Sequence, residues 1–230
     1  EQEKIEKTLL EIYQYLQKQP YSYEIIVVDD GSKDRTKEIV KGLKSRIKNL
    51  NIIDNSINRG KGYVVRQGLI RAQGQYRLFT DADNATSIDQ LEKFLPFITK
   101  GYDIVIGSRR VSGAHIIKSQ TWHRRILGVI YGLLVKVLVG IFDIKDTQCG
   151  FKMFSARGVD TIVPRSTINK WSFDPELLVI AKKFGFKIKE VPVVWSDDSD
   201  TRVGMKNTMS VVFDLLKIRL NLLQGRYSKP

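Results

Sequence analysis

Hydrophobic residues recur along this chain at two spacings, one typical of amphipathic helices and one typical of buried strands. In the first 18 residues the apolar side chains fall on one helical stripe: Ile5, Leu9, Ile12 and Leu16. Pro20 ends that pattern, and residues 24–28 then form a continuous, mostly β-branched run. Runs of this kind are typical of strands covered on both faces. The sequence therefore predicts a helix over residues 1–18 followed by a buried strand.

The same alternation continues to the end of the chain. Further strands are predicted at residues 50–53, 76–80, 103–106 and 186–195, with a strand-like segment after a turn within residues 143–154. Further helices are predicted at residues 34–47, 58–72, 87–98, 126–142, 174–184 and 211–223. Strands that alternate with helices favour an α/β fold with a mostly parallel, doubly wound sheet flanked by helices. We expect one domain spanning residues 1–230.

Polar clusters follow three of the predicted strands at their carboxyl ends. They are Asp29-Asp30-Gly31-Ser32, Asp81-Ala82-Asp83 and Gly107-Ser108-Arg109. Ligands of doubly wound sheets bind beyond the carboxyl ends of the strands, so the three clusters should line one crevice. Carboxylates for a base and ribose, together with a cation for phosphate, suit a nucleoside diphosphate. Each cluster by itself is also ordinary turn chemistry.

The pair Asp81 and Asp83 is the candidate metal site. Residues i and i+2 of a strand point to the same side, so the two carboxylates would project together if the strand continued through Asp83. Two close carboxylates repel unless they share a proton or bind a divalent cation, and Mg²⁺ or Mn²⁺ prefers hard oxygen ligands. The alternative is an Asp-rich turn that caps the helix beginning near Ser87.

Two other segments carry candidate phosphate ligands. Lys61 lies between two glycines at the start of a predicted helix, although glycines there would also serve helix entry alone. The polar loop at residues 197–207 contains Arg202 and could close over a substrate.

Asp174 and Pro175 look like the N-cap and first residue of a helix. Glu176 would then lie in the first helical turn, where it would either stabilise the helix dipole or face the crevice. Both alternatives are open at this point.

The stretch from residue 104 to residue 142 contains no Asp or Glu. Its first half is basic, and its second half, from residue 126, is apolar apart from Lys136 and small glycines. That second half is shorter than the roughly 20 residues that a membrane-spanning helix needs. An interfacial helix, a buried core helix and a membrane span are all open. The interfacial helix is favoured because basic residues leading into an apolar helix suit an anionic headgroup on a lipid tail. We therefore expect residues 108–142 to face a membrane.

Charge and cysteine content restrict the partners. The net charge of +13 attracts nucleic acid, acidic lipid headgroups or phosphorylated small molecules. The aromatic residues are not arrayed along a basic face, and no recognisable nucleic-acid module is present, so we expect no nucleic-acid partner. Cys149 is the only cysteine, which excludes an intramolecular disulfide and fits a reducing, cytosol-facing setting.

The motifs, taken in order, resemble those of the family 2 inverting glycosyltransferases of GT-A fold. The segments that carry the resemblance extend over nearly the whole chain: residues 27–32, 58–62, 81–83, 107–109, 146–152 and 173–177. Within that family the chain is most similar to the dolichyl-phosphate β-glucosyltransferases and next to the dolichyl-phosphate mannose synthases.

The resemblance implies a donor site for a nucleotide sugar. Asp29 and Asp30 would bind the nucleoside, with Ser32 beside them. Asp81 would serve the ribose and the metal, and Asp83 would be the direct ligand of Mg²⁺ or Mn²⁺.

It also implies an acceptor site. Arg109 and Arg124 match the family positions that hold the acceptor phosphate, so they join Asp83 as the expected catalytic residues. Arg202 falls in the loop that reaches the donor diphosphate, near which Lys61 is also expected. Glu1 matches the tail of a loop that contacts the nucleotide.

Three departures from the family pattern matter. The family usually opens with a strand and a nucleotide-contacting loop, of which only the tail at Glu1 is present, so we expect an N-terminal strand and an anchor before it to be missing. The mannose synthases often have a further metal-side ligand where this chain has Ala85 and a serine where it has Gly128. These differences weaken the mannose synthase assignment and leave the third metal ligand open.

The expected reaction is metal-dependent, inverting transfer of a hexose to dolichyl or polyprenyl phosphate. Glucose from UDP-glucose is the first choice, and mannose from GDP-mannose is the alternative. A phosphate monoester has a second pKa near 6 and is mostly dianionic at neutral pH, so no strong general base is needed. A hydroxyl acceptor would need one, for which Asp146, Asp174 and Glu176 are the candidates.

We expect such an enzyme at the cytoplasmic face of a membrane, the endoplasmic reticulum in a eukaryote or the plasma membrane in a prokaryote. Two other classes are open from the sequence. One is a sugar nucleotidyltransferase that uses Gly60 to Gly62 as a phosphate loop. The other is a non-catalytic basic module that binds lipid headgroups or nucleic acid.

Overall fold

The computed structural model describes the backbone of all residues except 119–120, 197–205 and 229–230, and the side chains of the rest except Arg124 and residues 206–209. The α-helices are α1 (Ile5–Leu16), α2 (Thr36–Leu43), α3 (Lys61–Arg71), α4 (Leu95–Thr99), α5 (Trp122–Leu134), α6 (Ala156–Ile162), α7 (Phe173–Lys183) and α8 (Lys206–Leu223). Short helical segments of other types are η1 (Ile88–Lys93), η2 (Val135–Val139) and η3 (Val163–Arg165). The strands are β1 (Ile25–Asp29), β2 (Leu50–Asp54), β3 (Tyr76–Thr80), β4 (Ile104–Ser108), β5 (His115–Lys118), β6 (Phe151–Ser155), β7 (Ile188–Pro192) and β8 (Val194–Ser196).

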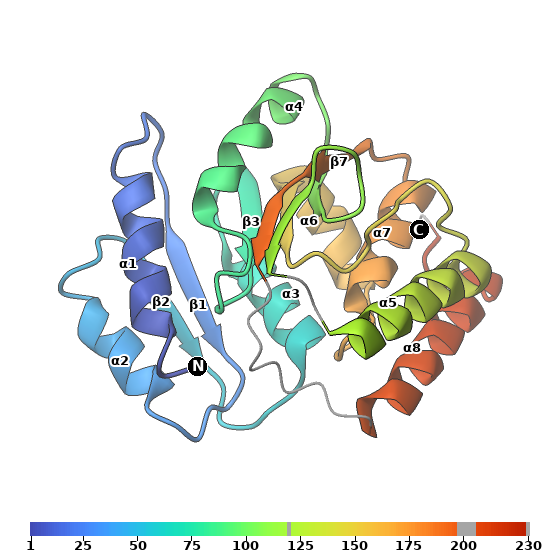
Figure 1. The fold of residues 1–230 in the computed structure, drawn as a ribbon, viewed down its shortest axis with the longest axis horizontal. Coiled ribbons are helices and arrows are strands. Elements are labelled where there is room, and N and C mark those ends of the chain that lie inside the picture. Colours follow the sequence, from blue (N-terminus) through green and yellow to red (C-terminus); the bar gives the residue numbers. More distant parts are fainter. Residues whose placement is uncertain (119–120, 197–205, 229–230) are drawn as a thin grey trace.

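The strands form three sheets with helices packed around them (Figure 1). β1 and β2 are parallel, and so are β5 and β8. The central sheet has the order β3-β6-β4-β7, in which β4 and β7 are parallel and β6 is antiparallel to both neighbours. The α/β class is confirmed, but the expectation of one mostly parallel sheet misses β6. The segment between β4 and β6 leaves the sheet at the carboxyl end of β4, and the chain re-enters the sheet from that same end. β6 therefore runs in the opposite direction to β4.

Two apolar cores lie on opposite faces of the central sheet. Phe151 and Met153 of β6 point into the core beneath α1, α2 and α4, whereas Phe154 points into the core beneath α6, α7 and α8. In β4, Val105 joins the first core and Ile104 the second. Successive strand residues alternate between faces, so each strand supplies both cores.

Two predicted helices differ from the expectation. The helix predicted at residues 87–98 is divided into η1 and α4, because Pro96 has no N–H to donate and its ring disfavours a continuous helix. The apolar helix predicted to begin at residue 126 begins at Trp122, widens into the π-helical segment η2, and ends at Gly140 with a φ of 83°.

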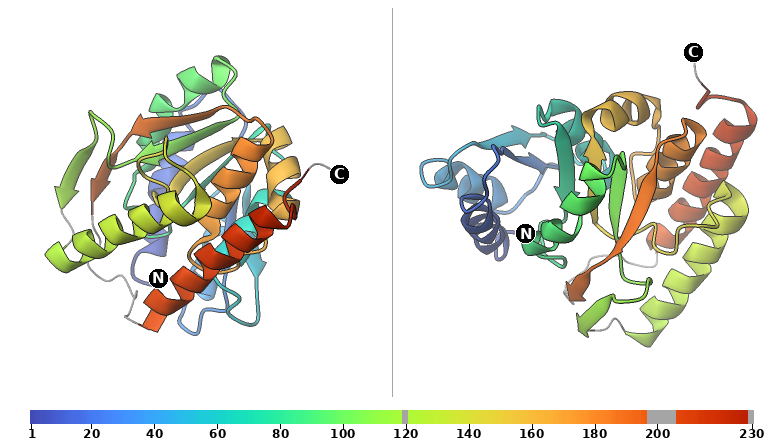
Figure 2. Two further views of the ribbon diagram at one scale, coloured as in Figure 1. Left: turned by 90° about the vertical axis from the view of Figure 1, so that its right-hand side faces the viewer. Right: turned by 90° about the horizontal axis from the view of Figure 1, so that it is seen from above.

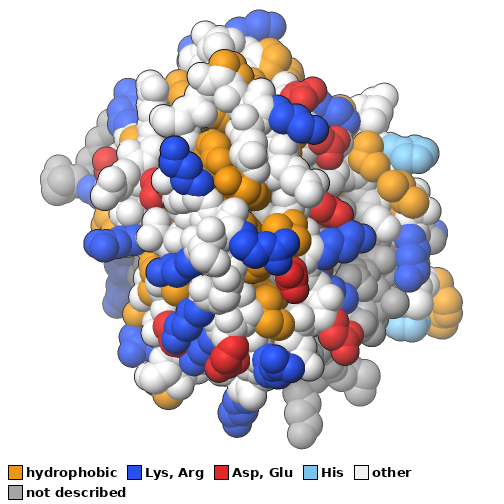
Figure 3. Space-filling model, turned by 90° about the vertical axis from the view of Figure 1, so that its left-hand side faces the viewer, with side chains coloured by type: hydrophobic (Ala, Val, Ile, Leu, Met, Phe, Trp, Pro, Cys, Tyr) orange, Lys and Arg blue, Asp and Glu red, His pale blue; other side chains and the backbone are white. Residues whose placement is uncertain are grey.

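Helices α5 and α8 lie side by side at the end of the molecule opposite α1 and α2 (Figures 1 and 2). Trp122 and Leu133 of α5 and Phe213 of α8 are all more than half exposed. Within the described part of the chain, no helix combines the length and the hydropathy needed to cross a membrane. On the face over α1 and α2, basic and acidic side chains are interspersed (Figure 3).

Candidate functional site

The carboxylates Asp81 and Asp83 are presented by a turn. β3 ends at Thr80, the N–H of Asn84 donates to the Asp81 carbonyl at 3.2 Å, and Asn84 has a φ of 55°. The N–H of Ala85 donates to Asp83 Oδ1 at 3.0 Å. The strand therefore does not continue through Asp83, which was the condition for the two carboxylates to project from it together. The turn given as the alternative is present, although no side chain caps the helical segment that begins after Ser87. A turn of this kind does not prevent metal binding, since Ala85 uses only one of the Asp83 oxygens.

Helix α1 holds this turn in place, which the sequence did not indicate. Thr8 Oγ1 donates to the Ala82 carbonyl at 3.0 Å, and Asn84 Nδ2 donates to Glu11 Oε2 at 2.6 Å. Thr8 interrupts the hydrophobic stripe of α1 and is nevertheless buried. In the sequence, the feature that corresponds to this contact is a hydroxyl residue next to the apolar stripe of the helix.

Lys61 is brought directly to the carboxylate pair. Its Nζ lies 2.6 Å from Asp81 Oδ1 and 5.6 Å from the centre of the Trp171 ring. Burial lowers the pKa of Lys61, but the carboxylates of Asp81, Asp174 and Asp83 outweigh it, and the net effect is a raised pKa. Lys61 is thus a firmly charged ammonium at the entry of α3, as a phosphate ligand must be. Trp171 is a further site residue that the sequence analysis missed.

Gly150 supplies the space that the Asp81 carboxylate occupies. A Cβ built at position 150 would lie 1.9 Å from Asp81 Oδ2. Gly150 precedes β6, which pairs with β3, and this pairing brings residue 150 beside Asp81. No sequence signal beyond its place in the resembling segment indicated this role.

The two carboxylates suit a divalent cation. Burial raises the pKa of Asp83; the hydrogen bond from Ala85 and the charge of Lys61 oppose this, and Asp81 and Glu1 add to it. A cation would relieve this cost of a buried negative charge. In the described part of the chain there is no group of three His, Cys, Asp or Glu side chains that could hold a metal. A cation at this turn would therefore have Asp81 and Asp83 as protein ligands and would need further oxygens from water or substrate phosphate, which is a pattern that Mg²⁺ accepts.

The β1 cluster closes around the loop that leads to α3. Asp29 Oδ2 accepts from the N–H of Ser32 at 2.9 Å. Asp30 accepts from the N–H of Arg59 at 2.7 Å and from that of Gly60 at 2.9 Å. Asp30 thereby ties the end of β1 to the entry of α3, immediately before Lys61.

Arg109 forms an ion pair at the end of β4. Its Nε lies 2.7 Å from Asp146 Oδ2, its second nitrogen lies 2.9 Å from Oδ1, and its backbone N–H also donates to Asp146. The guanidinium also lies over the Trp195 ring at 5.2 Å. Burial would raise the pKa of Asp146, but Arg109 lowers it to about 2. Asp146 therefore orients Arg109 and is poorly suited to act as a base.

Asp174 and Glu176 are both buried and both engaged. Asp174 lies inside the first turn of α7, whose N-cap is Ser172, so the predicted N-cap role is wrong. Its Oδ1 accepts from the fully buried Lys152 at 2.5 Å. The neighbouring Phe173 side chain is fully buried in the apolar core. Glu176 accepts hydrogen bonds from residues 167–168 and from Tyr227 and does not face the crevice.

The remaining predicted residues are placed as follows. Arg124 lies on α5, and its side chain is outside the described atoms; Arg202 is outside the described residues. Gly128 of α5, at the position where the mannose synthases often have a serine, accepts from the Arg110 guanidinium through its carbonyl at 3.0 Å. Glycine at position 132, one turn further along α5, allows Arg110 to lie against the helix, since a Cβ there would approach the guanidinium to 3.0 Å.

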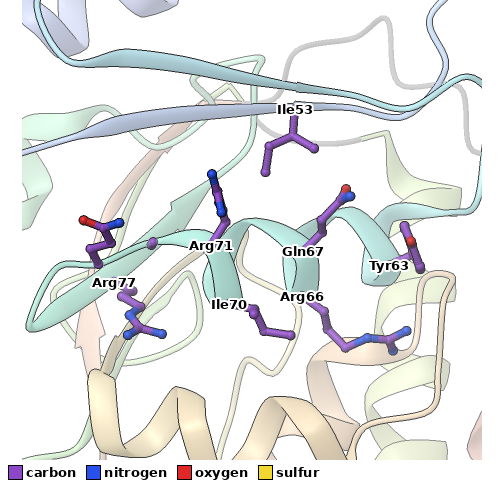
Figure 4. A pocket seen from close by; sticks show the side chains of 9 residues that line it. Ile53, Tyr63, Arg66, Gln67, Ile70, Arg71 and Arg77 are labelled. Atoms are coloured by element: carbon purple, nitrogen blue, oxygen red, sulfur yellow. The ribbon is translucent and has the colours of Figure 1, made fainter.

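A separate hollow lies beside α3, between that helix and Ile53 of β2 (Figure 4). It is lined in part by Arg66 and Arg77, and it contains neither Asp81 nor Asp83. Arg66 donates to the Ile168 carbonyl, and Arg77 donates to the Leu69 carbonyl. Arg66 and Arg77 are therefore already engaged by backbone carbonyls.

Comparison with known sequences gives a match to one protein family. Residues 1–159 match the model described as glycosyl transferase family 2. The chain is 35% identical over 236 residues to a dolichyl-phosphate beta-glucosyltransferase of Trichomonas vaginalis, covering 96% of this chain and 72% of the relative. It is 34% identical to that of Saccharomyces cerevisiae, covering 89% and 66%, and 31% identical to that of Homo sapiens, covering 99% and 74%.

Comparison with solved structures supports the GT-A fold. Glucosyl-3-phosphoglycerate synthase from Mycobacterium tuberculosis, in complex with Mn²⁺, UDP-glucose and phosphoglyceric acid, has a TM-score of 0.69 at 14% identity, covering 99% of this chain and 76% of that one. Mannosyl-3-phosphoglycerate synthase from Rubrobacter xylanophilus has a TM-score of 0.63 at 14% identity, covering 99% and 72%.

Proposed function

Because the chain belongs to glycosyl transferase family 2 and is a glycosyltransferase, we propose that it transfers glucose from UDP-glucose to dolichyl phosphate or another polyprenyl phosphate, with inversion. The observation that carries this proposal is the turn with Asp81 and Asp83, with Lys61 at Asp81, in a chain similar to enzymes named for this reaction. A non-catalytic basic module would not need that arrangement.

The donor would bind along the carboxyl ends of β1 and β3. Asp81 and Asp83 would hold Mg²⁺ or Mn²⁺, which supplies positive charge to the UDP leaving group when bound. Lys61 would bind the diphosphate from the entry of α3, together with Arg202, which precedes α8 in the chain. The nucleoside would lie toward Glu1 and toward the β1 cluster, which consists of Asp29, Asp30 and Ser32.

The acceptor phosphate would bind at Arg109 and Arg124. An oxygen of the lipid phosphate would attack the anomeric carbon of glucose while the bond from that carbon to UDP breaks, so one displacement inverts the configuration. The three carboxylates considered as general bases are each engaged: Asp146 with Arg109, Asp174 with Lys152, and Glu176 with residues 167–168. This supports a phosphate acceptor, which needs no strong base.

The membrane would lie against the exposed apolar residues of α5 and α8. Trp122 is 74% exposed, Leu133 is 61% exposed, and Phe213 is 64% exposed. The exposed Arg125 and Arg219 lie on the same two helices and would attract acidic headgroups. We propose association with the cytoplasmic face of the endoplasmic reticulum in a eukaryote or of the plasma membrane in a prokaryote.

The test is transfer of labelled sugar into the organic phase. The protein is incubated with dolichyl phosphate, Mn²⁺ or Mg²⁺, and either UDP-glucose or GDP-mannose. We expect label from UDP-glucose only, abolished by Asp83→Ala and by a chelator, whereas Glu38→Ala on the exposed face of α2 leaves transfer unchanged. Label from GDP-mannose alone would contradict the donor assignment, and full activity in the chelator would contradict the metal role.

A further inference from the structure

The segment that connects η3 to α7 packs against the first turn of α3. A Cβ at Gly60 would lie 2.5 Å from the Asn169 carbonyl oxygen, and one at Gly62 would lie 2.6 Å from that of Ile168. The N–H of Tyr63 donates to the Asn169 carbonyl at 3.1 Å. The backbone on either side of Lys61 is therefore packed directly on residues 168–169. The same segment ends at Trp171, whose ring lies beside the Lys61 ammonium.

The conformation of this segment is fixed by one buried carboxylate. Glu176 is fully buried and accepts from the N–H of Thr167 at 2.9 Å, from Thr167 Oγ1 at 2.8 Å and from the N–H of Ile168 at 2.9 Å. A buried carboxylate is costly unless its oxygens are hydrogen-bonded, and here both oxygens are. No step of the proposed transfer uses Glu176, so its burial requires another explanation.

The chain after α8 completes the same network. The fully buried Tyr227 donates its hydroxyl to Glu176 Oε1 at 2.6 Å. Asn221 of α8 donates to the Tyr227 hydroxyl at 2.9 Å and to Thr167 Oγ1 at 3.1 Å. Burial and then the Glu176 carboxylate raise the pKa of Tyr227, so its hydroxyl stays protonated and available as a donor.

We propose that Glu176, held by Tyr227, is a positioning residue that sets the place of Lys61 through residues 167–171. The inference rests on the proposed function, because Lys61 matters for turnover only if it binds the donor diphosphate. It assigns the end of α8 a role in the donor site. The helix that carries the exposed Phe213 also fixes residues 167–171, which pack against the backbone on either side of Lys61. In this proposal Glu176 fixes residues 167–171, and these residues in turn fix the start of α3.

The test uses Tyr227→Phe and Glu176→Gln in the full chain. Tyr227→Phe removes one hydroxyl, and Glu176→Gln places an amide donor against the donors of residues 167–168. We expect faster amide hydrogen exchange at residues 60–63 and 167–171 in both variants. We also expect KM for UDP-glucose to rise about tenfold, as is typical for residues that orient a ligand-binding group, with a much smaller change in kcat.

Two control variants separate positioning from loss of stability. Tyr76→Phe removes an exposed hydroxyl on β3 and should change neither readout. Ile218→Val removes a buried methyl group from α8 without touching the network and should lower the thermal midpoint while leaving KM unchanged. If Tyr227→Phe and Glu176→Gln lower the midpoint but behave as Ile218→Val in exchange and KM, the positioning role is wrong.

The exchange measurement needs no substrate, so it decides the structural link by itself. If the unaltered protein transfers no sugar from UDP-glucose, the proposed function fails while the exchange result still stands. If transfer is normal and residues 60–63 exchange at unchanged rates in both variants, the inference fails and the function stands.

Discussion

At the scale of single residues, Gly150 connects β6 to the chemistry of β3. A Cβ added at residue 150 would overlap the Asp81 carboxylate, which is the end of a side chain that can rotate away. A substitution there would thus cost little folding free energy and would move one of the two expected metal ligands. A residue without a functional group is therefore expected to affect activity strongly.

We predict that Gly150→Ala lowers sugar transfer by about a hundredfold while the thermal midpoint changes little, because ligand-orienting changes typically cost 10–100-fold in metal affinity or activity. The measurement is Mn²⁺ binding by calorimetry together with the transfer assay. Gly42→Ala is the matched control: a Cβ there meets nothing within 4 Å. Normal Mn²⁺ affinity and normal transfer in Gly150→Ala would contradict the packing argument.

The ion pair of Arg109 and Asp146 is the second residue whose effect follows from its environment. The pKa of Asp146 is lowered to about 2 in the folded protein. Its stabilising contribution is therefore fully present above the ordinary Asp value of about 3.9 and is lost as the pH falls from there toward about 2.

We predict that Asp146→Asn lowers the free energy of unfolding by about 3 kcal/mol at neutral pH, because the largely buried Arg109 is left unpaired. The difference between the two proteins should be constant from pH 8 to pH 5 and should shrink below about pH 4. Denaturant unfolding at a series of pH values measures it. A difference that grows on acidification would have the wrong sign for this pair.

At the scale of elements, α5 and α8 form one exposed apolar surface. The sequence favoured an interfacial role for the segment containing α5, but it left α8 open between packing on the domain and lying on a membrane. The helix packs on the domain through Leu215 and Ile218, which are fully buried, whereas Phe213 and Leu216 are exposed. Only the packing of α8 against η2 shows which residues remain outside.

We predict that Leu133→Ser with Phe213→Ser lowers affinity for vesicles of mixed phosphatidylcholine and phosphatidylserine by roughly tenfold or more, since each large apolar side chain contributes about 1.5–3 kcal/mol on burial. Cosedimentation with vesicles measures this. Ile57→Ser with Ile70→Ser is the matched control, because both residues are 59% exposed and lie outside α5 and α8. Equal losses in the two double variants would contradict a specific docking surface.

At the scale of the whole molecule, the candidate site is assembled from distant parts of the chain. Lys61 enters from α3, Asp81 from the end of β3, and Gly150 from the start of β6. The antiparallel insertion of β6 between β3 and β4 brings the last of these to the first two. The route from Tyr227 through Glu176 to the α3 entry similarly joins the end of the chain to residues 60–62.

The sequence by itself determined the α/β class, the amphipathic stripe of α1, and the positions of Asp81 and Arg109 at strand ends. Each follows from local periodicity or from the rule that places ligands at carboxyl strand ends. The family resemblance followed from the ordered motifs. These properties depend on residues close together in the chain, so a linear pattern is enough to indicate them.

Only the tertiary structure decided which charged groups pair. Asp146 orients Arg109, Asp174 holds Lys152, and Glu176 fixes the loop behind Lys61. In the sequence each of these carboxylates was a candidate base, with an N-cap role also open for Asp174 and a helix-dipole role for Glu176. Their roles depend on the direction of β6, on the burial of the start of α7, and on where α8 packs. Burial makes an unpaired charge costly, so the partner that folding supplies fixes what each carboxylate does.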